Sequence, residues 1–237
     1  MKFFFICFLL ILFIFSRSSC DWVYGQADDL GAGMADIAQK SVKVGGCEIN
    51  TLKAGSPKGK DILLLHGMSF QAQTWKDLGT LETLGNAGYD VTAVDMPGFG
   101  LTKKCGLGPD AALMGLFEAE GLQRPVLVGP SMGGRISLNF ALDHPELVGG
   151  LVLIGCVGVE ENRGRLGTIT VPTLIVWGSK DHVAPMSNAE LLNKEVRDSK
   201  LLVIEGARHP AYLDNPELWH RELLAFLGAG WLFVFHE

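Results

Sequence analysis

The sequence feature that most restricts the fold is a short segment at residues 124–135. Within it an apolar run at 126–128 leads to Gly129, Ser131 follows two residues later, and Gly133 begins a helical pattern of apolar residues. Small residues on either side of a strained central residue let a strand and a helix close tightly around it, so we expect a strand, a sharp turn and a helix. The Ser131 hydroxyl would then project from the end of a sheet, beside the free amides that start the helix.

Strand and helix patterns alternate along the rest of the chain. Apolar runs that predict buried strands occupy residues 61–65, 89–94, 126–128, 150–154, 173–177 and 201–204, and helical spacing occurs at 75–87, 111–120, 133–144, 189–196 and 216–227. An alternating pattern around Gly45-Gly46 predicts a β-hairpin over residues 41–53. This order predicts an α/β fold with a mostly parallel, doubly wound sheet flanked by helices.

Three residues suited to nucleophilic catalysis follow predicted strands. In a doubly wound sheet, functional groups gather beyond the carboxyl ends of the strands. Ser131, Asp181 and His209 each come directly after their own strand, in that chain order. The order is the one typical of the α/β-hydrolase elbow.

The chemistry needs each of these residue types. A serine hydroxyl becomes an effective nucleophile when an imidazole accepts its proton, and a carboxylate on the other ring nitrogen fixes the imidazole's orientation. We therefore assign Ser131 as nucleophile, His209 as base and then acid, and Asp181 as the group that orients His209. The backbone amides of Met68 and Met132 follow the first and the elbow strands, and are the expected oxyanion donors.

Each assignment has a structural alternative. Ser131 could be a turn residue, Asp181 a helix-entry carboxylate and His209 a surface residue. We expect His66 to brace the loop that carries Met68, and the Met68 and Met132 side chains to form pocket wall. Two further positions have structural interpretations only: Asp95 in a tight turn near the mouth of the site, and His144 at a helix end.

The segment between two of the later strands, residues 155–171, is too short for a separate lid domain. An open site suits small or peripheral acyl groups and encloses a long lipid chain poorly.

Charge and cysteine spacing restrict the partners. The formal net charge is −6, which argues against non-specific nucleic-acid binding. No Cys-x-x-Cys pair or His/Cys ligand spacing occurs, so no metal site is expected. Outside the first 20 residues the cysteines are Cys47, Cys105 and Cys156; their odd number favours free buried thiols, and their pairing stays open.

The two ends of the chain differ from the central part. Residues 1–19 carry Lys2 and a long apolar run, which predicts a cleaved signal peptide or, alternatively, a membrane anchor. In either case we expect the chain to enter the secretory pathway, and to be secreted or lumenal if the leader is cleaved. Residues 20–40 are interpreted as a linker and 41–227 as the folded domain. The apolar tail at 228–237 has three interpretations: an edge strand, a partner surface or a non-native terminus.

Several motifs together resemble the α/β-hydrolase superfamily. They are His66-Gly67, Asp95-x-Pro97-Gly98-x-Gly100, the elbow at Ser131, Gly178-x-x-Asp181 and Gly206-x-x-His209, within a likeness that covers residues 42–227. The stretches 65–75 and 206–220, and Pro130 before the nucleophile, are similar to the small alpha/beta hydrolase domain-containing protein fourteen branch. That resemblance implies the serine triad, hydrolysis of small acyl esters, acyl transfer from lysine amines to coenzyme A, and an N-terminal anchor in one relative type.

The leading functional expectation is therefore a serine hydrolase that acts on a small acyl substrate through an acyl-enzyme, with no cofactor. One alternative is an acyltransferase that uses coenzyme A, whose phosphates would need basic partners such as Lys103, Lys104, Arg163 and Arg165. A second alternative, supported only by the apolar tail, is a non-catalytic interaction module.

Overall fold

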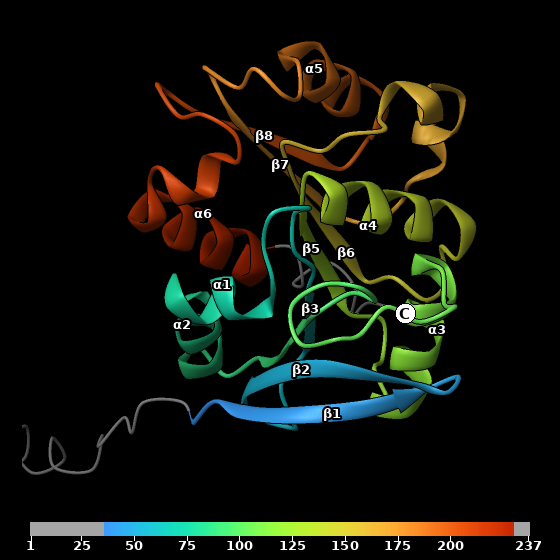
Figure 1. Cartoon of the computed structure of the whole chain (residues 1–237). Helices are drawn as coiled ribbons and strands as arrows, with labels where there is room; N and C mark the ends of the chain where they lie inside the picture. The colour runs from blue at the N-terminus through green and yellow to red at the C-terminus, as the bar shows by residue number, and fades with distance from the viewer. Residues whose placement is uncertain (1–35, 230–237) are drawn as a thin grey trace, which may run out of the picture. The chain divides into compact units, whose positions relative to one another are not determined.

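The computed structural model describes residues 36–229, which form a sheet of eight strands in the order β1-β2-β4-β3-β5-β6-β7-β8 (Figure 1). The strands are β1 (Ala38–Val44), β2 (Cys47–Gly55), β3 (Asp61–Leu64), β4 (Asp90–Val94), β5 (Val126–Pro130), β6 (Gly150–Ile154), β7 (Thr173–Gly178) and β8 (Ser199–Ile204). The hairpin β1–β2 joins β4 in antiparallel fashion, and β4, β3, β5, β6, β7 and β8 are parallel. The carboxyl ends of the parallel strands therefore meet at one edge of the sheet.

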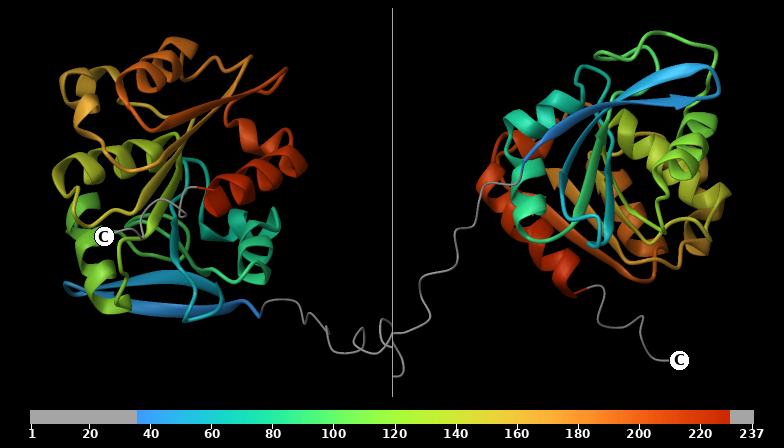
Figure 2. Two further views of the ribbon diagram at one scale, coloured as in Figure 1. Left: turned by 180° about the vertical axis from the view of Figure 1, so that it is seen from behind. Right: turned by 90° about the horizontal axis from the view of Figure 1, so that it is seen from below.

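Helices cover both faces of the sheet. One face carries α1 (Ala72–Asp77), α2 (Thr80–Asn86) and α6 (Pro216–Ala229), and the other carries α3 (Pro109–Glu120), α4 (Met132–Asp143), α5 (Met186–Glu195) and the 3-10 segment η1 (Glu160–Thr168), as Figures 1 and 2 show. A second 3-10 turn, η2 (Ala211–Leu213), precedes α6. This three-layer arrangement is the doubly wound α/β fold that the alternating pattern predicted, and it is the α/β-hydrolase fold that the motifs and the resemblance implied. No lid is evident among residues 36–229.

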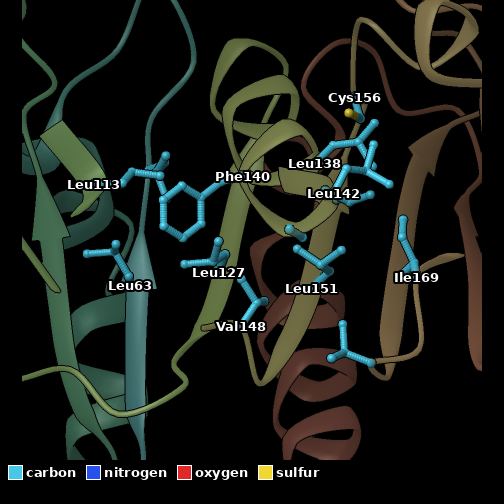
Figure 3. Close-up of a cluster of buried hydrophobic side chains, with 14 of the residues drawn as sticks. Leu63, Leu113, Leu127, Leu138, Phe140, Leu142, Val148, Leu151, Cys156 and Ile169 are labelled. Atoms are coloured by element: carbon cyan, nitrogen blue, oxygen red, sulfur yellow. The ribbon is translucent and has the colours of Figure 1, made fainter. Parts of the chain in front are cut away.

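The alternation of side chains along buried strands explains why helices are needed on both faces. In β3, Leu63 packs toward α3 and α4 while Ile62 and Leu64 pack toward the opposite layer. Figure 3 shows Leu63 and neighbouring strand residues beneath Phe140 of α4 and Leu113 of α3. Because each fully buried Leu or Phe side chain contributes about 1.5–3 kcal/mol, two such faces anchor the strand ends firmly.

Local details differ from the sequence-based expectations at two places. The single helix expected over residues 75–87 is two short helices, because the chain turns at Gly79, whose φ is +79°. The hairpin begins at Ala38, so the strand takes up the last residues of the expected linker 20–40. Residues 1–35 and 230–237 lie outside the described part, and with them the predicted leader 1–19, residues 20–35 of that linker and residues 230–237 of the tail. Within residues 36–229, no helix combines the length and the apolar character needed to cross a membrane.

The cysteines also correct an expectation. Cys47 at the start of β2 and Cys105 in the loop after β4 form a disulfide, where free thiols were favoured. Cys156 is free and buried, and burial raises the pKa of its thiol. The disulfide fastens the loop between β4 and α3 to the edge hairpin.

Candidate active site

The elbow at Ser131 has the geometry that its sequence predicts. Ser131 has φ +51° and ψ −110°, a strained combination for a residue with a side chain, and it caps the N-terminus of α4. A Cβ atom on Gly129 would lie 2.4 Å from the Gly133 carbonyl, so strand and helix approach too closely for a side chain there. The Ser131 amide donates to the Ile154 carbonyl at 2.8 Å, which fixes the turn against the end of β6.

Asp181 and His209 contact each other directly. The His209 Nδ1 atom lies 2.7 Å from Asp181 Oδ2, and the two side chains are 12% and 1% exposed. Asp181 Oδ1 accepts hydrogen bonds from the amides of Val183 and Ala184, both at 2.8 Å. Since a carboxylate can only accept, Nδ1 of His209 carries the proton that it donates, which leaves Nε2 available to take another.

Ser131 lies at the same edge of the sheet as this pair. Strands β5, β6, β7 and β8 are consecutive neighbours, and the three residues follow the first, third and fourth of them. The end of β6 connects the two sides: Ile154 accepts the Ser131 amide, and a Cβ atom on the next residue, Gly155, would lie 2.9 Å from His209 Nδ1. Among residues 36–229, no hydrogen bond joins the Ser131 hydroxyl to the His209 ring.

Two backbone amides beside the elbow remain available. Met132 begins α4 and Met68 follows β3, and neither amide has an acceptor within the described part of the chain. The two segments are in contact, because a Cβ atom on Gly133 would lie 2.8 Å from the His66 carbonyl oxygen. Both donors predicted for an oxyanion therefore lie on adjacent segments.

His66 braces the loop that carries Met68, as expected. Its Nδ1 lies 2.8 Å from the Gly67 carbonyl and its Nε2 accepts the Met96 amide at 3.1 Å. Burial lowers the pKa of His66, although its bond to Gly67 and the charge of Asp95 oppose this effect. The ring is therefore neutral, with its proton on Nδ1.

Asp95 has the structural role expected of it. Its carboxylate is buried and accepts from the Ala72 amide at 2.6 Å, and from the Asn50 side chain and the Leu101 amide at 2.9 Å each. These bonds hold the turn after β4 and the start of α1. His144 caps the end of α4, also as expected.

A cleft of about 390 Å³ opens beside the start of α4. Its lining is mainly apolar, and its charged or polar members are Asp110, Arg135, Asn139 and Asp143. The other lining residues are Met96, Pro97, Phe99, Leu107, Pro109, Met132, Ile136 and Phe140. Met132 is part of this wall, as expected, whereas Met68 is not, because its side chain is 69% exposed.

The sequence interpretation missed Arg135 and the loop residues that line the cleft. Arg135 follows Ser131 by four residues on a predicted helix, a spacing that could have placed the two on one face. The loop residues carried no such signal, since they reach the cleft from the segment that the disulfide holds.

The basic residues considered for coenzyme A lie elsewhere or are already paired. Lys103 and Lys104 line a different hollow, next to Cys105. Arg163 pairs with Glu160 at 2.8 Å, and Arg165 pairs with Asp143 at 2.7 Å. Between residues 36 and 229, no group of three or more His, Cys, Asp or Glu side chains is arranged to hold a metal ion.

Comparison with known proteins agrees with this fold. Residues 61–214 match the model of the alpha/beta hydrolase family. Human ABHD14B, whose name provisionally describes a protein-lysine deacylase, is 36% identical over 174 residues, covering 70% of this chain and 82% of the relative. ABHD14A of Danio rerio is 36% identical over 173 residues, covering 70% of this chain and 63% of the relative.

Solved structures show the same fold. A hydrolase of Thermoplasma acidophilum, described as CIB-like, superposes with a TM-score of 0.79 at 30% identity, covering 81% of this chain and 98% of that one. Carboxylesterase CesB of Bacillus subtilis superposes with a TM-score of 0.73 at 18% identity, covering 81% and 92%. The strained elbow, the strand order and these relatives agree that the chain belongs to the α/β-hydrolase family, in its ABHD14 group.

Proposed function

We propose that this protein is a serine hydrolase that cleaves a small carboxylic ester or related acyl bond through an acyl-enzyme. The observation that carries the proposal is the Asp181–His209 contact at 2.7 Å, with the carboxylate held by two amides, at the same strand edge as the strained Ser131. A serine hydroxyl is activated when an imidazole near it accepts its proton and a buried carboxylate orients that imidazole. The serine–histidine bond itself forms on substrate binding, as hydrogen bonds of this kind often tighten only in the substrate complex.

The reaction proceeds in two balanced steps. The Ser131 oxygen forms a bond to the acyl carbon while His209 Nε2 takes the hydroxyl proton, and the leaving alcohol departs with that proton. Water then attacks the acyl carbon while His209 takes a proton from the water, and His209 returns that proton to the Ser131 oxygen as its bond to the acyl carbon breaks and the carboxylic acid leaves. In both steps the carbonyl oxygen becomes an anion that the Met68 and Met132 amides stabilise, and loss of one such donor typically costs about 10²–10³ in rate.

A second candidate activity is removal of an acyl group from a lysine side chain. It is favoured by the name of the ABHD14B relatives, at 33–36% identity, and it uses the same residues with an amine as leaving group. Transfer of the acyl group to coenzyme A instead of water is a variant of this activity.

The first experiment is fluorophosphonate labelling of the full chain. We expect the wild type to label, and Ser131→Ala and His209→Ala to lose labelling while remaining folded by circular dichroism. Ser137→Ala is a matched control, because Ser137 lies on the same helix and its buried hydroxyl has no hydrogen-bond partner within the described residues. Equal labelling of Ser131→Ala and wild type would sink the proposal.

Substrate assays then separate the candidate activities. A 4-nitrophenyl ester and an acetyl-lysine peptide are offered with and without coenzyme A, and products are identified by mass spectrometry. Free acid indicates hydrolysis, and acyl-coenzyme A indicates transfer. Turnover of the peptide but not of the ester would favour lysine deacylation as the activity.

We also propose that the chain matures in the secretory pathway. The expected leader at 1–19 and the Cys47–Cys105 disulfide support this independently, since stable disulfides belong to oxidising compartments. Thiol alkylation of protein from its native source, with the modified positions identified by peptide mass spectrometry, tests it. The expected result after unfolding is that Cys47 and Cys105 are blocked and Cys156 is alkylated, and alkylation at all three of these positions is the opposite one.

A further inference from the structure

Arg135 is a charged residue that lines the cleft beside the start of α4 and that the reaction above does not use. It lies one helical turn after the nucleophile, and its amide donates to the Ser131 carbonyl at 3.0 Å. Residues four apart share a helix face, and helical side chains lean toward the N-terminus, so Arg135 extends from the face that carries Ser131. Both Arg135 and Met132 line the 390 Å³ cleft.

The guanidinium of Arg135 has a weak partner in this structure. Its Nη2 lies 3.9 Å from the exposed Glu161 carboxylate, and the Arg135 side chain is 52% exposed. Each of the two acids in the cleft lining already has a side-chain partner: Asp110 lies 2.9 Å from the His144 ring, and Asp143 pairs with Arg165 at 2.7 Å. Among the described residues that line the cleft, Arg135 is thus the one lysine or arginine, and its only ion pair in the described part of the chain is the long contact with Glu161, which leaves its charge accessible to an anion.

The aliphatic part of the Arg135 side chain packs against Gly158. A Cβ atom on Gly158 would lie 2.9–3.0 Å from Arg135 Cγ, Cδ and Nε, so the side chain packs directly on that backbone. Packing of this kind reduces the conformational entropy that the guanidinium loses when it binds a ligand.

The positions of the catalytic groups show which half of a substrate enters the cleft. Met132, whose amide would hold the carbonyl oxygen, lines the cleft and directly follows Ser131, whereas Ser131 itself and His209, which gives its proton to the leaving group, do not line it. The acyl chain therefore enters the cleft, along the apolar walls formed by Phe99, Ile136 and Phe140.

We propose that the preferred acyl group is that of a short dicarboxylic acid, whose methylene carbons lie against these walls and whose free carboxylate pairs with Arg135. This inference rests on the proposed hydrolase function and names the substrate class of the same site. A guanidinium suits it because its fork of donors matches a carboxylate in two parallel hydrogen bonds.

The test compares two esters of the same shape, 4-nitrophenyl hydrogen succinate and the neutral 4-nitrophenyl 4-methylpentanoate. Rates with Ser131→Ala are subtracted, because a neighbouring carboxylate accelerates spontaneous hydrolysis. We expect wild type to prefer the succinate in kcat/KM, and Arg135→Gln to lower the succinate-to-methylpentanoate ratio about tenfold, mainly through KM. The preference should also weaken as ionic strength rises.

Arg221→Gln is the matched control, because Arg221 lies on α6 and is 67% exposed. An unchanged ratio in Arg135→Gln, or a wild-type preference for the neutral ester, overturns the inference while leaving the hydrolase proposal intact. Absence of Ser131-dependent turnover of both esters overturns the hydrolase proposal and this inference with it.

If Arg135→Gln does not fold, Glu161→Gln decides. Removing the carboxylate near Arg135 should raise the preference for the succinate about twofold, and an unchanged or lower preference counts against the inference.

Discussion

The two ends of the parallel sheet both carry charged side chains, but they use charge differently. At the carboxyl end, Asp181 holds His209 in one orientation, and the amides of Met68 and Met132 are left without acceptors in the described chain. At the amino end, a hollow of about 750 Å³ is lined by four basic and three acidic side chains, among other residues: Lys40, Lys53, Lys60, Arg124, Asp61, Asp90 and Glu120.

In the larger hollow, at the amino end, several of the charged side chains pair with one another. Glu120, whose side chain is only 3% exposed, lies 3.0 Å from both Lys40 and Lys53, and Lys53 lies 3.7 Å from Asp90. These side chains neutralise one another and join β1, β2, β4 and α3. The size of a hollow is therefore a poor guide to the candidate site, which we place at the carboxyl end because the amides of Met68 and Met132 have no acceptor there within the described residues.

The largest effect that this comparison predicts is on turnover. Asp181→Asn should lower kcat by about 10³–10⁴, because an amide can favour the wrong tautomer of His209. Asp90→Asn, at the amino end, should change kcat less than twofold. Comparable losses in both variants, measured on a chromogenic ester, would mean that the two ends are not functionally distinct.

The second effect concerns the loop that lines the active-site cleft. Cys47→Ser/Cys105→Ser removes a cross-link between residues separated by 58 in sequence, and should lower the free energy of unfolding by about 3–4 kcal/mol. Urea unfolding measures this change. Dithiothreitol should destabilise the wild type but not the double variant, and a wild type insensitive to dithiothreitol would show that the bond does not restrain the unfolded chain.

A smaller effect is expected from the ion pairs at the amino end. Glu120→Gln should cost about 1–2 kcal/mol of stability and leave kcat unchanged. Burial tends to raise the pKa of Glu120, but the bonds from Lys40 and Lys53 outweigh it and lower the pKa below 4.5. The stabilisation is thus present above pH 4.5 and is lost as pH falls through the lowered pKa, so the variant should show a shallower acid transition. An identical transition in both proteins would contradict this assignment.

The smallest effect comes from His66 at the carboxyl end. Because its folded pKa is lowered below 6.5, the unfolded chain binds a proton more readily, and stability falls as pH drops from 6.5 toward the folded pKa. His66→Gln should reduce the slope of stability against pH in this window. The two ends should therefore weaken in different pH ranges, and a slope unaffected by the substitution would remove His66 as its source.

The sequence predicted what depends on local pattern. The apolar runs located β3 through β8 because strands buried on both faces require continuous apolar residues. The positions of Ser131, Asp181 and His209 followed, since each lies immediately after such a strand. Asp181 and His209 do meet, although 28 residues separate them.

What the sequence missed depends on contacts between distant segments. The Cys47–Cys105 disulfide joins the edge hairpin to the loop after β4, and the positions of the two cysteines in the sequence do not indicate that they are close in space. The cleft is built from the loop after β4, α3 and α4, so its size and the position of Arg135 within it required the packed structure. The break at Gly79 came from a backbone conformation that the hydrophobic period of residues 75–87 conceals.

The placement of the three candidate catalytic residues after β5, β7 and β8 has a practical consequence for work in living cells. A chain whose synthesis stops before His209 lacks the proposed base. In a misfolded full-length chain, the ends of β5, β7 and β8 are not assembled side by side, so the three residues do not come together. If the serine is activated as proposed, the labelled fraction of the total protein in a cell reports the fraction that has completed folding. Destabilised variants could then be ranked in their native compartment without purification.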